Sequence, residues 1–381
     1  MPRPIPANSL PRLGDFTTDR RVLMLVAMAV LVSAGTAWLL LRAIALVTNA
    51  VWLHTLGTQT LPTANLKPDA WMVAAPAFGG LVIGLMARFG SEKIRGHGIP
   101  EAIEAILIGG SRLQPKVAVL KPLSSAISIG TGGPFGAEGP IIMTGGAVGS
   151  LFAQCFRLSA AERKALLVAG AVAGMTAIFG TPVAAVMLAI ELLLFELKPR
   201  SLIPVIAACV VSSSLRPRLI GSGALFPFAG QLDLPWCGPL ACVGVGVVAG
   251  LQSGLLTTLL YKAEDFFNHL PIHWMWWPAI GGLFLGAGGL IEPRALGVGY
   301  DIIGDLLNDN MVVSAAVQIL LVKSAIWIVA LASGASGGVL APLLIFGGCV
   351  GWLEGQLLPG PHGAWALIGM AAMMAAPCAR R

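Results

Sequence analysis

The residues best suited to do chemistry are Gly136-Ala137-Glu138-Gly139-Pro140, a single carboxylate between glycines ahead of the apolar run 141–156. A helix is expected to begin here, because proline fits the first turn, where its missing N–H removes no hydrogen bond. The glycines leave backbone N–H groups open to a ligand, and the positive end of the helix dipole favours an anion. An ionised Glu138 is itself an anion that can occupy this position or swing away. The alternative is a carboxylate that only caps the helix.

The composition indicates a chain that crosses a membrane several times. Hydrophobic residues make up 56% of the 381, charged residues make up 11%, and the mean hydropathy is +0.83. A helix needs about 20 apolar residues to cross a bilayer, and an ionisable group at membrane depth is usually kept for an ion pathway or a proton relay. The predicted spans are 22–41, 71–86, 165–179, 240–260, 277–291 and 312–331.

Basic residues near the predicted spans set the expected orientation. Four arginines lie in the tail 1–20 and at position 21, the loop 51–70 has one lysine, and the loop 88–95 has three basic residues. Because cytoplasmic loops carry an excess of Lys and Arg, we expect the tail 1–20 in the cytoplasm. The net charge of +6 belongs to such loops. No basic helix face has interleaved aromatic residues, so we expect no nucleic-acid partner.

Cysteine and histidine usage argues against a metal site or an enzyme. The five histidines are dispersed, and the chain has neither an HExxH nor a GxSxG motif. We therefore expect no metal, no cofactor and no enzymatic activity. The cysteines have no ligand spacing and are interpreted as small apolar residues rather than disulfides. They are residues 155, 209, 237, 242, 349 and 378.

The chain contains an internal repeat. Residues 76–84 recur as 278–286 with a shift of 202, and Gly96-His97-Gly98 recurs as Gly297-Val298-Gly299 with a shift of 201. Duplicated halves with short segments broken by Gly or Pro are typical of transporters, whose broken helices point at a site near the midplane. We predict an all-α polytopic membrane protein, an inverted-repeat bundle of tilted and broken helices. The predicted parts are tail 1–20, membrane domain 21–376 with repeats of about 21–218 and 235–376, and tail 377–381.

Three glycine-rich loops each begin a predicted helix. They are Gly96-His97-Gly98-Ile99-Pro100, Gly136 to Pro140, and Gly338-Val339-Leu340-Ala341-Pro342. Together they supply N–H donors and aligned dipoles without a full positive charge, which attracts a small anion yet releases it. Lys121 precedes the second loop and has two interpretations. It adds a longer-range field, or it is an interfacial lysine whose ammonium reaches water.

In order and spacing, these loops resemble the three signature segments of the CLC family of chloride channels and chloride/proton exchangers. The similarity runs from about residue 20 to about residue 375. It implies a homodimer with one anion pathway per subunit, in the bacterial inner membrane, without appended CBS domains. Glu138 would be the gate. The amides of Val339 and Leu340 would line a central site for chloride or a similar anion, and those of Ala137 to Gly139 an outer one.

Two departures from the family pattern bear on selectivity and mechanism. His97 replaces a serine that touches the anion; a neutral imidazole still donates one hydrogen bond, unless it turns to the aqueous vestibule. In the family's exchangers, a second glutamate on the cytoplasmic side passes protons. The equivalent position here is Leu192, which favours passive, channel-like conduction. The alternative is a proton-coupled exchanger in which Glu191 or Glu196 substitutes. Glu191 is otherwise a helix-end or interface carboxylate.

The end of the chain is the largest departure. Residues 364–374 resemble 165–176, but no counterparts of 182–196 and 203–214 follow them. In the family this stretch carries much of the dimer surface and a tyrosine that helps coordinate the central anion, whereas no tyrosine follows Tyr300 here. We therefore expect a C-terminally shortened member, and a non-conducting fragment is a further interpretation.

Overall fold

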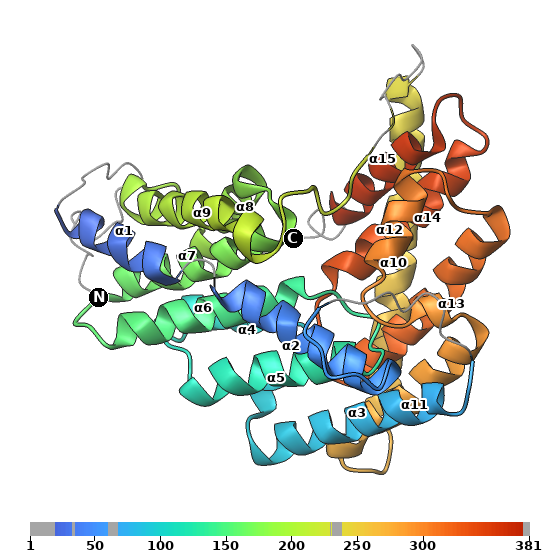
Figure 1. Ribbon diagram of the computed structural model, residues 1–381, viewed down its shortest axis with the longest axis horizontal. Coiled ribbons are helices and arrows are strands. Elements are labelled where there is room, and N and C mark those ends of the chain that lie inside the picture. The colour runs from blue at the N-terminus through green and yellow to red at the C-terminus, as the bar shows by residue number, and fades with distance from the viewer. Residues whose placement is uncertain (1–19, 33–34, 60–67, 229, 231–237, 376–381) are drawn as a thin grey trace, which may run out of the picture.

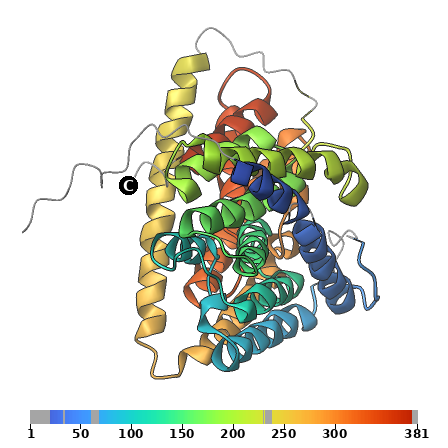
Figure 2. The same ribbon diagram turned by 90° about the vertical axis from the view of Figure 1, so that its left-hand side faces the viewer.

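The computed structural model describes residues 20–32, 35–59, 68–228, 230 and 238–375, and its regular elements there are helices and one isolated β-bridge. Figure 1 shows tilted helices, and Figure 2 shows the long α10 standing along one side. The first half contains α1 (Arg20–Val32), α2 (Gly35–Trp52), α3 (Trp71–Phe89), η2 (Glu92–Ile94), α4 (Ile99–Leu107), α5 (Pro115–Gly130), α6 (Glu138–Gln154), α7 (Ala160–Phe179), α8 (Pro182–Leu188), η3 (Ala189–Leu194) and α9 (Pro199–Leu219). The second half contains α10 (Gly238–Asn268), η4 (Trp274–Trp276), α11 (Trp277–Ile291), η5 (Pro293–Ala295), α12 (Tyr300–Leu307), α13 (Val313–Ala332), α14 (Leu340–Gly355) and α15 (His362–Ala375).

Among the described residues, six helical stretches are long and apolar enough to cross a membrane. They are Arg20–Trp52, Trp71–Phe89, Pro199–Leu219, Gly238–Asn268, Trp274–Ile291 and Val313–Ala332. Five of them overlap predicted spans, and the prediction missed Pro199–Leu219. The predicted span 165–179 belongs to α7, which has three charged residues, Glu162 to Lys164, near its start and is enclosed by protein along most of its length. The predicted span 22–41 is divided between α1 and α2.

The repeat is visible where α3 crosses α11, helices that lie side by side in Figure 1. A Cβ atom added to Gly80 would overlap the carbonyl oxygen of Pro278, and one added to Gly282 would overlap that of Pro76. Gly282 and Pro278 are Gly80 and Pro76 shifted by 202 residues, so the contact is reciprocal, as a two-fold relation requires. Glycine at the crossing lets the two backbones approach closely.

Two helix pairs repeat the same packing. In each pair, glycines of the first helix lie against backbone carbonyls of the second, so that a Cβ atom would overlap the oxygen. The contacts are Gly145 with Gly170 and Gly149 with Leu166 between α6 and α7, and Gly347 with Gly369 and Gly351 with Trp365 between α14 and α15. This confirms the predicted correspondence of 364–374 with 165–176 and the inverted-repeat bundle.

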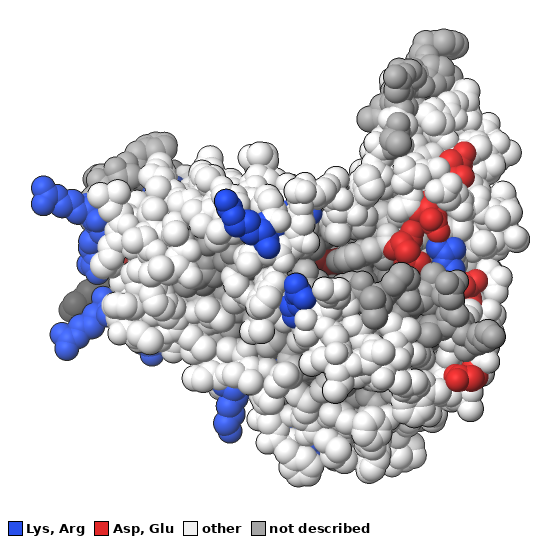
Figure 3. All heavy atoms as spheres, viewed as in Figure 1, with Lys and Arg blue, Asp and Glu red and all other residues white. Residues whose placement is uncertain are grey.

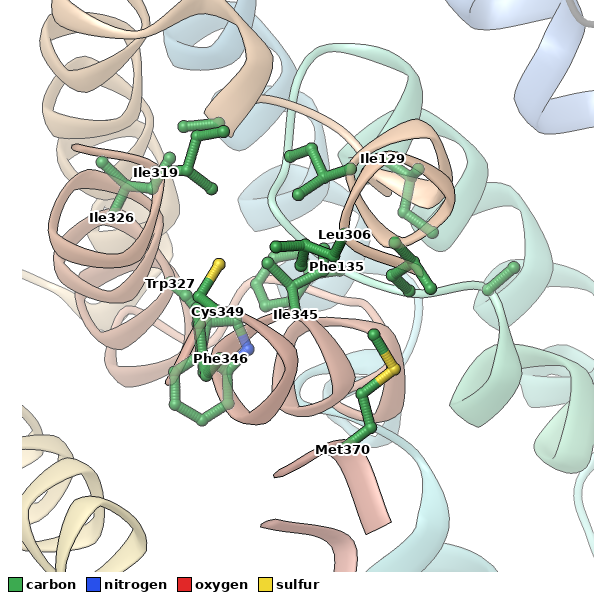
Figure 4. Packing of buried hydrophobic residues seen from close by; sticks show 14 of the residues in the cluster. Ile129, Phe135, Leu306, Ile319, Ile326, Trp327, Ile345, Phe346, Cys349 and Met370 are labelled. Atoms are coloured by element: carbon green, nitrogen blue, oxygen red, sulfur yellow. The ribbon is translucent and has the colours of Figure 1, made fainter. Parts of the chain in front are cut away.

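The core of the second half includes the loop that leads into α6. Figure 4 shows Phe135 from this loop beside Leu306 of α12 and Ile345 of α14, and all three side chains are buried. Gly337 makes room for the aromatic ring, because a Cβ there would overlap the Phe135 side chain. The loop before α6 is therefore anchored in the other half of the molecule.

The surface is largely uncharged. Figure 3 shows one mostly white face, with basic side chains mainly on the side of α1 and α7 and acidic ones on the side of α12 and α13. Exposed apolar residues follow one side of α10 at helical spacing, as expected for a face that lipid covers. They are Leu240, Val243, Val247, Leu251 and Leu255.

Some predictions lie outside the described residues. These are the tails 1–19 and 377–381, Cys237 and Cys378, and the start of the second repeat near residue 235. The four described cysteines are free thiols.

Candidate anion-binding site

The three glycine-rich loops begin helices as predicted. Helix α4 begins at Ile99, α6 at Glu138 and α14 at Leu340, with Pro100, Pro140 and Pro342 in their first turns. A fourth helix, α12, follows Gly299 in the same way as α4 follows Gly98. Both glycines have positive φ values, +89° at Gly98 and +78° at Gly299, a conformation that costs other residues energy.

Backbone hydrogen bonds join the loops of the two halves. The Gly136 N–H donates to the Gly338 carbonyl at 2.9 Å, and the Gly338 N–H donates to the Gly136 carbonyl at 2.8 Å. The Gly337 N–H donates to the Gly96 carbonyl at 3.4 Å and brings in the third loop. Together these bonds place the N-termini of α4, α6 and α14 around one point. Backbone groups in the membrane need such internal partners, because lipid offers none.

The Glu138 carboxylate lies at this meeting point and is fully buried. Its Oε1 accepts a hydrogen bond from the Tyr300 hydroxyl at 2.8 Å, whereas Oε2 has no hydrogen-bond partner among the described residues. The backbone amides of Glu138 itself and of Ala341 lie within electrostatic reach of the carboxylate. Since Ala341 belongs to the first turn of α14, the side chain reaches across to the other half. The carboxylate therefore does more than cap its own helix, because its contacts include α12 and α14.

His97 lies at the junction of α4 and α6. Its Nδ1 is buried and has no hydrogen-bond partner among the described residues, so the imidazole does not turn wholly to water. The His97 carbonyl packs against Gly139, where a Cβ atom would overlap it. Val339 is the residue before α14 and Leu340 is its first residue. The backbone of His97 and the N-termini of α6 and α14 therefore lie close together beside Glu138.

Two buried lysines hold the loops in equivalent ways. Lys121 on α5 donates to the carbonyls of Ile94, Arg95 and Gly96 at 2.9, 3.3 and 2.7 Å. Lys323 on α13, 202 positions later, donates to the carbonyls of Ala295 and Gly297 at 2.8 and 2.9 Å. Lys121 is fully buried, so its interpretation as an interfacial lysine that reaches water is wrong. Each ammonium fixes the loop before a helix start.

We expect Lys323→Met to lower the free energy of unfolding by about 2 kcal/mol. The substitution leaves two buried carbonyls without a donor, at about 1–3 kcal/mol each, and the relieved desolvation of the ammonium offsets part of that. The check is the thermal unfolding midpoint of the purified protein in detergent. Lys262→Met, at an exposed lysine on α10, is the control and should leave the midpoint unchanged. Equal midpoints for both variants would contradict a loop-fixing role.

The candidate proton-transfer residues lie in and after η3, a turn of π-helix. Leu192 packs against the core of the first half. Glu191 is exposed and has no ion pair among the described residues. Glu196 forms ion pairs with Lys164 at 2.8 Å and Lys198 at 3.3 Å, so its carboxylate is already engaged. Of the two glutamates, only Glu191 is exposed without an ion pair among the described residues.

Comparison with known proteins identifies the family. The model of the family described as voltage gated chloride channel matches residues 78–379 of this chain. The chain belongs to the CLC family. Among curated CLC relatives, the voltage-gated ClC-type chloride channel ClcB of Escherichia coli O81 is 31% identical over 337 residues, 84% of this chain and 78% of that protein. The protein of the same name from Salmonella typhimurium is 30% identical over 325 residues, 83% of this chain and 77% of that protein.

Solved CLC structures share the fold. The chain matches a slow cyanobacterial Cl⁻/H⁺ antiporter with a TM-score of 0.78 and 20% identity, covering 94% of this chain and 86% of that one. It matches a CLC-type fluoride/proton antiporter with a TM-score of 0.79 and 18% identity, covering 94% and 88%. At these identities the likeness concerns the fold. The family model that matches residues 78–379 supports anion transport across a membrane as the function of this CLC protein at the level of its family.

Sequence reasoning missed Tyr300 as a residue of the site. A signal was present, because Tyr300 follows Gly299 as Ile99 follows Gly98, and this places it at the start of a helix that follows a glycine-rich loop. It is also one of only two tyrosines in the chain. Its partner Glu138 is 162 positions away, and no local pattern connects the two.

Proposed function

We propose that this protein conducts chloride or a similar small anion passively, through a pathway that Glu138 gates. The observation that carries the proposal is the buried Glu138 carboxylate where the N-termini of α4, α6 and α14 meet. Helix N-termini offer free N–H groups and positive partial charge, so a carboxylate there stands where an anion would bind. The carboxylate and the anion cannot both accept hydrogen bonds from these N–H groups at the same time.

The donors divide into an inner and an outer group in this proposal. The amides of Val339 and Leu340 at the start of α14 bind the central anion, and those of Ala137 and Gly139 at the start of α6 bind the outer one. His97 and Gly98, before α4, complete the lining. The ammonium groups of the two buried lysines bind carbonyls of the protein instead of the anion. An anion bound only by backbone dipoles, without direct contact to a positively charged side chain, can be released fast.

The direct test is chloride efflux from liposomes that contain the purified protein, measured with and without an imposed pH gradient. We expect efflux above that of empty liposomes, with a rate that rises as the pH falls and Glu138 protonates. The proposal would be overturned if a thermal unfolding measurement shows that the protein is folded and it still gives no efflux. That outcome would favour the non-conducting interpretation.

We expect a chloride gradient to drive little stoichiometric proton movement, since Leu192 at the inner proton-transfer position cannot carry a proton. The measurement is the external pH of weakly buffered liposomes during chloride efflux. Glu191→Gln should leave this result unchanged, because a passive pathway needs no inner relay. Robust uphill proton pumping would contradict passive conduction, and its loss in Glu191→Gln would assign the relay to Glu191.

The second candidate function is proton-coupled anion exchange. The observation that favours it is the exposed Glu191 beside Leu192, together with the two solved proteins of this fold whose titles describe antiporters. The proton measurement above separates the two candidates.

We propose that the protein is a homodimer in a bacterial inner membrane, with the N-terminus in the cytoplasm. The excess of basic residues in the loop 88–95 over the loop 51–70 supports this orientation. The chloride-channel relatives are bacterial proteins. Cysteine labelling of either loop in intact cells tests the orientation.

A further inference from the structure

The contact between Tyr300 and Glu138 is a polar side-chain bond between the two halves, at the junction of the glycine-rich loops. The Tyr300 hydroxyl donates to Glu138 Oε1 at 2.8 Å. Tyr300 is the first residue of α12, and Glu138 is the first residue of α6. Each residue therefore projects from the start of a helix, and each helix belongs to a different repeat.

The repeat shows that the fold does not require this polar pair. A shift of 202 relates Glu138 to Leu340, and a shift of 201 relates Tyr300 to Ile99. The two-fold related positions therefore carry two apolar residues. A pair that served packing alone would suit Leu and Ile on both sides of the pseudo-two-fold axis. The carboxylate and the hydroxyl occur together on one side only, which indicates a role in the transport cycle.

Tyr300 is held more firmly than a mobile gate would be. Its ring packs edge-on against Phe226 with 5.4 Å between the ring centroids. Lys323 fixes the carbonyl of Gly297 in the loop before it, and Ile302 and Ile303 bury the next turn of α12 in the core. When the Glu138 side chain moves, the hydroxyl therefore stays in place and loses its acceptor.

We propose that the Tyr300 hydroxyl holds ionised Glu138 in the closed position and, once that carboxylate leaves, donates the same hydrogen bond to the passing anion. The proposal rests on the gate role proposed for Glu138. A buried hydroxyl without an acceptor is costly, and the incoming anion supplies one at the moment the carboxylate withdraws. Tyr300 is thus a positioning residue for the gate and a contact for the transported ion.

Other titratable and charged groups around Glu138 belong to several neighbouring elements. His97 precedes α4, and Lys121 on α5 binds carbonyls and lies near Glu101. Lys323 on α13 binds carbonyls and lies near Asp301. None of them is hydrogen-bonded to the Glu138 carboxylate, so removing the Tyr300 hydroxyl changes the one side-chain partner that it has among the described residues.

The first test is Tyr300→Phe, which keeps the ring and its packing on Phe226. The hydrogen bond shifts the protonation equilibrium of Glu138 toward the ionised carboxylate by about tenfold or more, as is usual for bonds to charged groups. Its loss lets Glu138 protonate at higher pH, so the pH of half-maximal flux should rise by about one unit. Tyr261→Phe, at the other tyrosine of the chain, which is exposed on α10, should leave the profile unchanged.

A second variant tests the opposite sign. In Tyr261→Phe protein, Tyr300 is the sole tyrosine, so growth on 3-fluorotyrosine modifies this position alone. The more acidic hydroxyl is a stronger donor, and the pH of half-maximal flux should fall. A shift in the same direction as that of Tyr300→Phe would indicate a packing effect and overturn the proposal.

The third arm measures the anion contact without the gate. In a Glu138→Ala background, adding Tyr300→Phe should weaken chloride binding on the order of tenfold by calorimetry. If Glu138→Ala abolishes the pH dependence but Tyr300→Phe changes neither pH profile nor affinity, the gate stands and the Tyr300 proposal fails. If Glu138→Ala leaves the pH dependence intact, the gate fails and the Tyr300 proposal fails with it.

Discussion

Glu138→Ala is expected to abolish the pH dependence of anion flux while leaving conduction intact. The ionised carboxylate competes with the anion for the helix N-termini, and alanine has no charge to compete with or to titrate. Flux at neutral pH should therefore rise to the level that the unsubstituted protein reaches only at acidic pH, on the order of tenfold higher. The measurement is chloride efflux from liposomes between about pH 4.5 and pH 8, a range that extends well above the pKa of a free glutamate.

Glu264→Ala, at a glutamate on α10, is the matched control and should keep the pH profile of the unsubstituted protein. A folded Glu138→Ala protein whose flux still rises as the pH falls would show that another group titrates in the pathway. A folded protein that conducts no anion at any pH would show that the carboxylate is needed for conduction itself.

Gly338→Ala is expected to disrupt the junction between the two halves. An added Cβ would lie 2.6 Å from the Gly136 carbonyl oxygen and 2.9 Å from the Gly139 nitrogen, and both of these are backbone atoms at the start of α6 that cannot move aside as a flexible side chain would. Overpacking of this kind costs about 1–3 kcal/mol or more. We expect a lower thermal unfolding midpoint in detergent and a large loss of flux, because the bridge that aligns α6 and α14 must open.

Gly246→Ala on α10 is the control for this substitution. Nothing lies within 4 Å of a Cβ added there, and alanine favours the helix by up to about 1 kcal/mol. Its unfolding midpoint and flux should equal or exceed those of the unsubstituted protein. Unfolding midpoints that agree between Gly338→Ala and Gly246→Ala would mean that the loops are not tightly joined at Gly136 and Gly338.

The sequence by itself determined the features that depend on local chemistry. Sparse charge and long apolar stretches require a membrane, and proline within the first turn after glycine-rich loops fixed the starts of α4, α6 and α14. The repeat shift of 202 predicted two duplicated halves, and the reciprocal contacts of Gly80 and Gly282 agree with that repeat, although only the structure shows that α3 and α11 pack against each other. The sequence also singled out Glu138, since a lone carboxylate between glycines before an apolar stretch is conspicuous without any knowledge of its neighbours.

The tertiary structure alone decided what surrounds that carboxylate. The bridge between Gly136 and Gly338 and the bond from Tyr300 to Glu138 join residues more than 150 positions apart, and they form only when the two halves pack together. Lys121 shows the same limit, because an amphipathic side chain is equally compatible with an interface or a buried cluster of carbonyls. Which one it meets depends on the loop 94–96, which the folded first half places against α5. Local patterns specify where helices begin, whereas the partners of a buried polar group follow from how the helices meet.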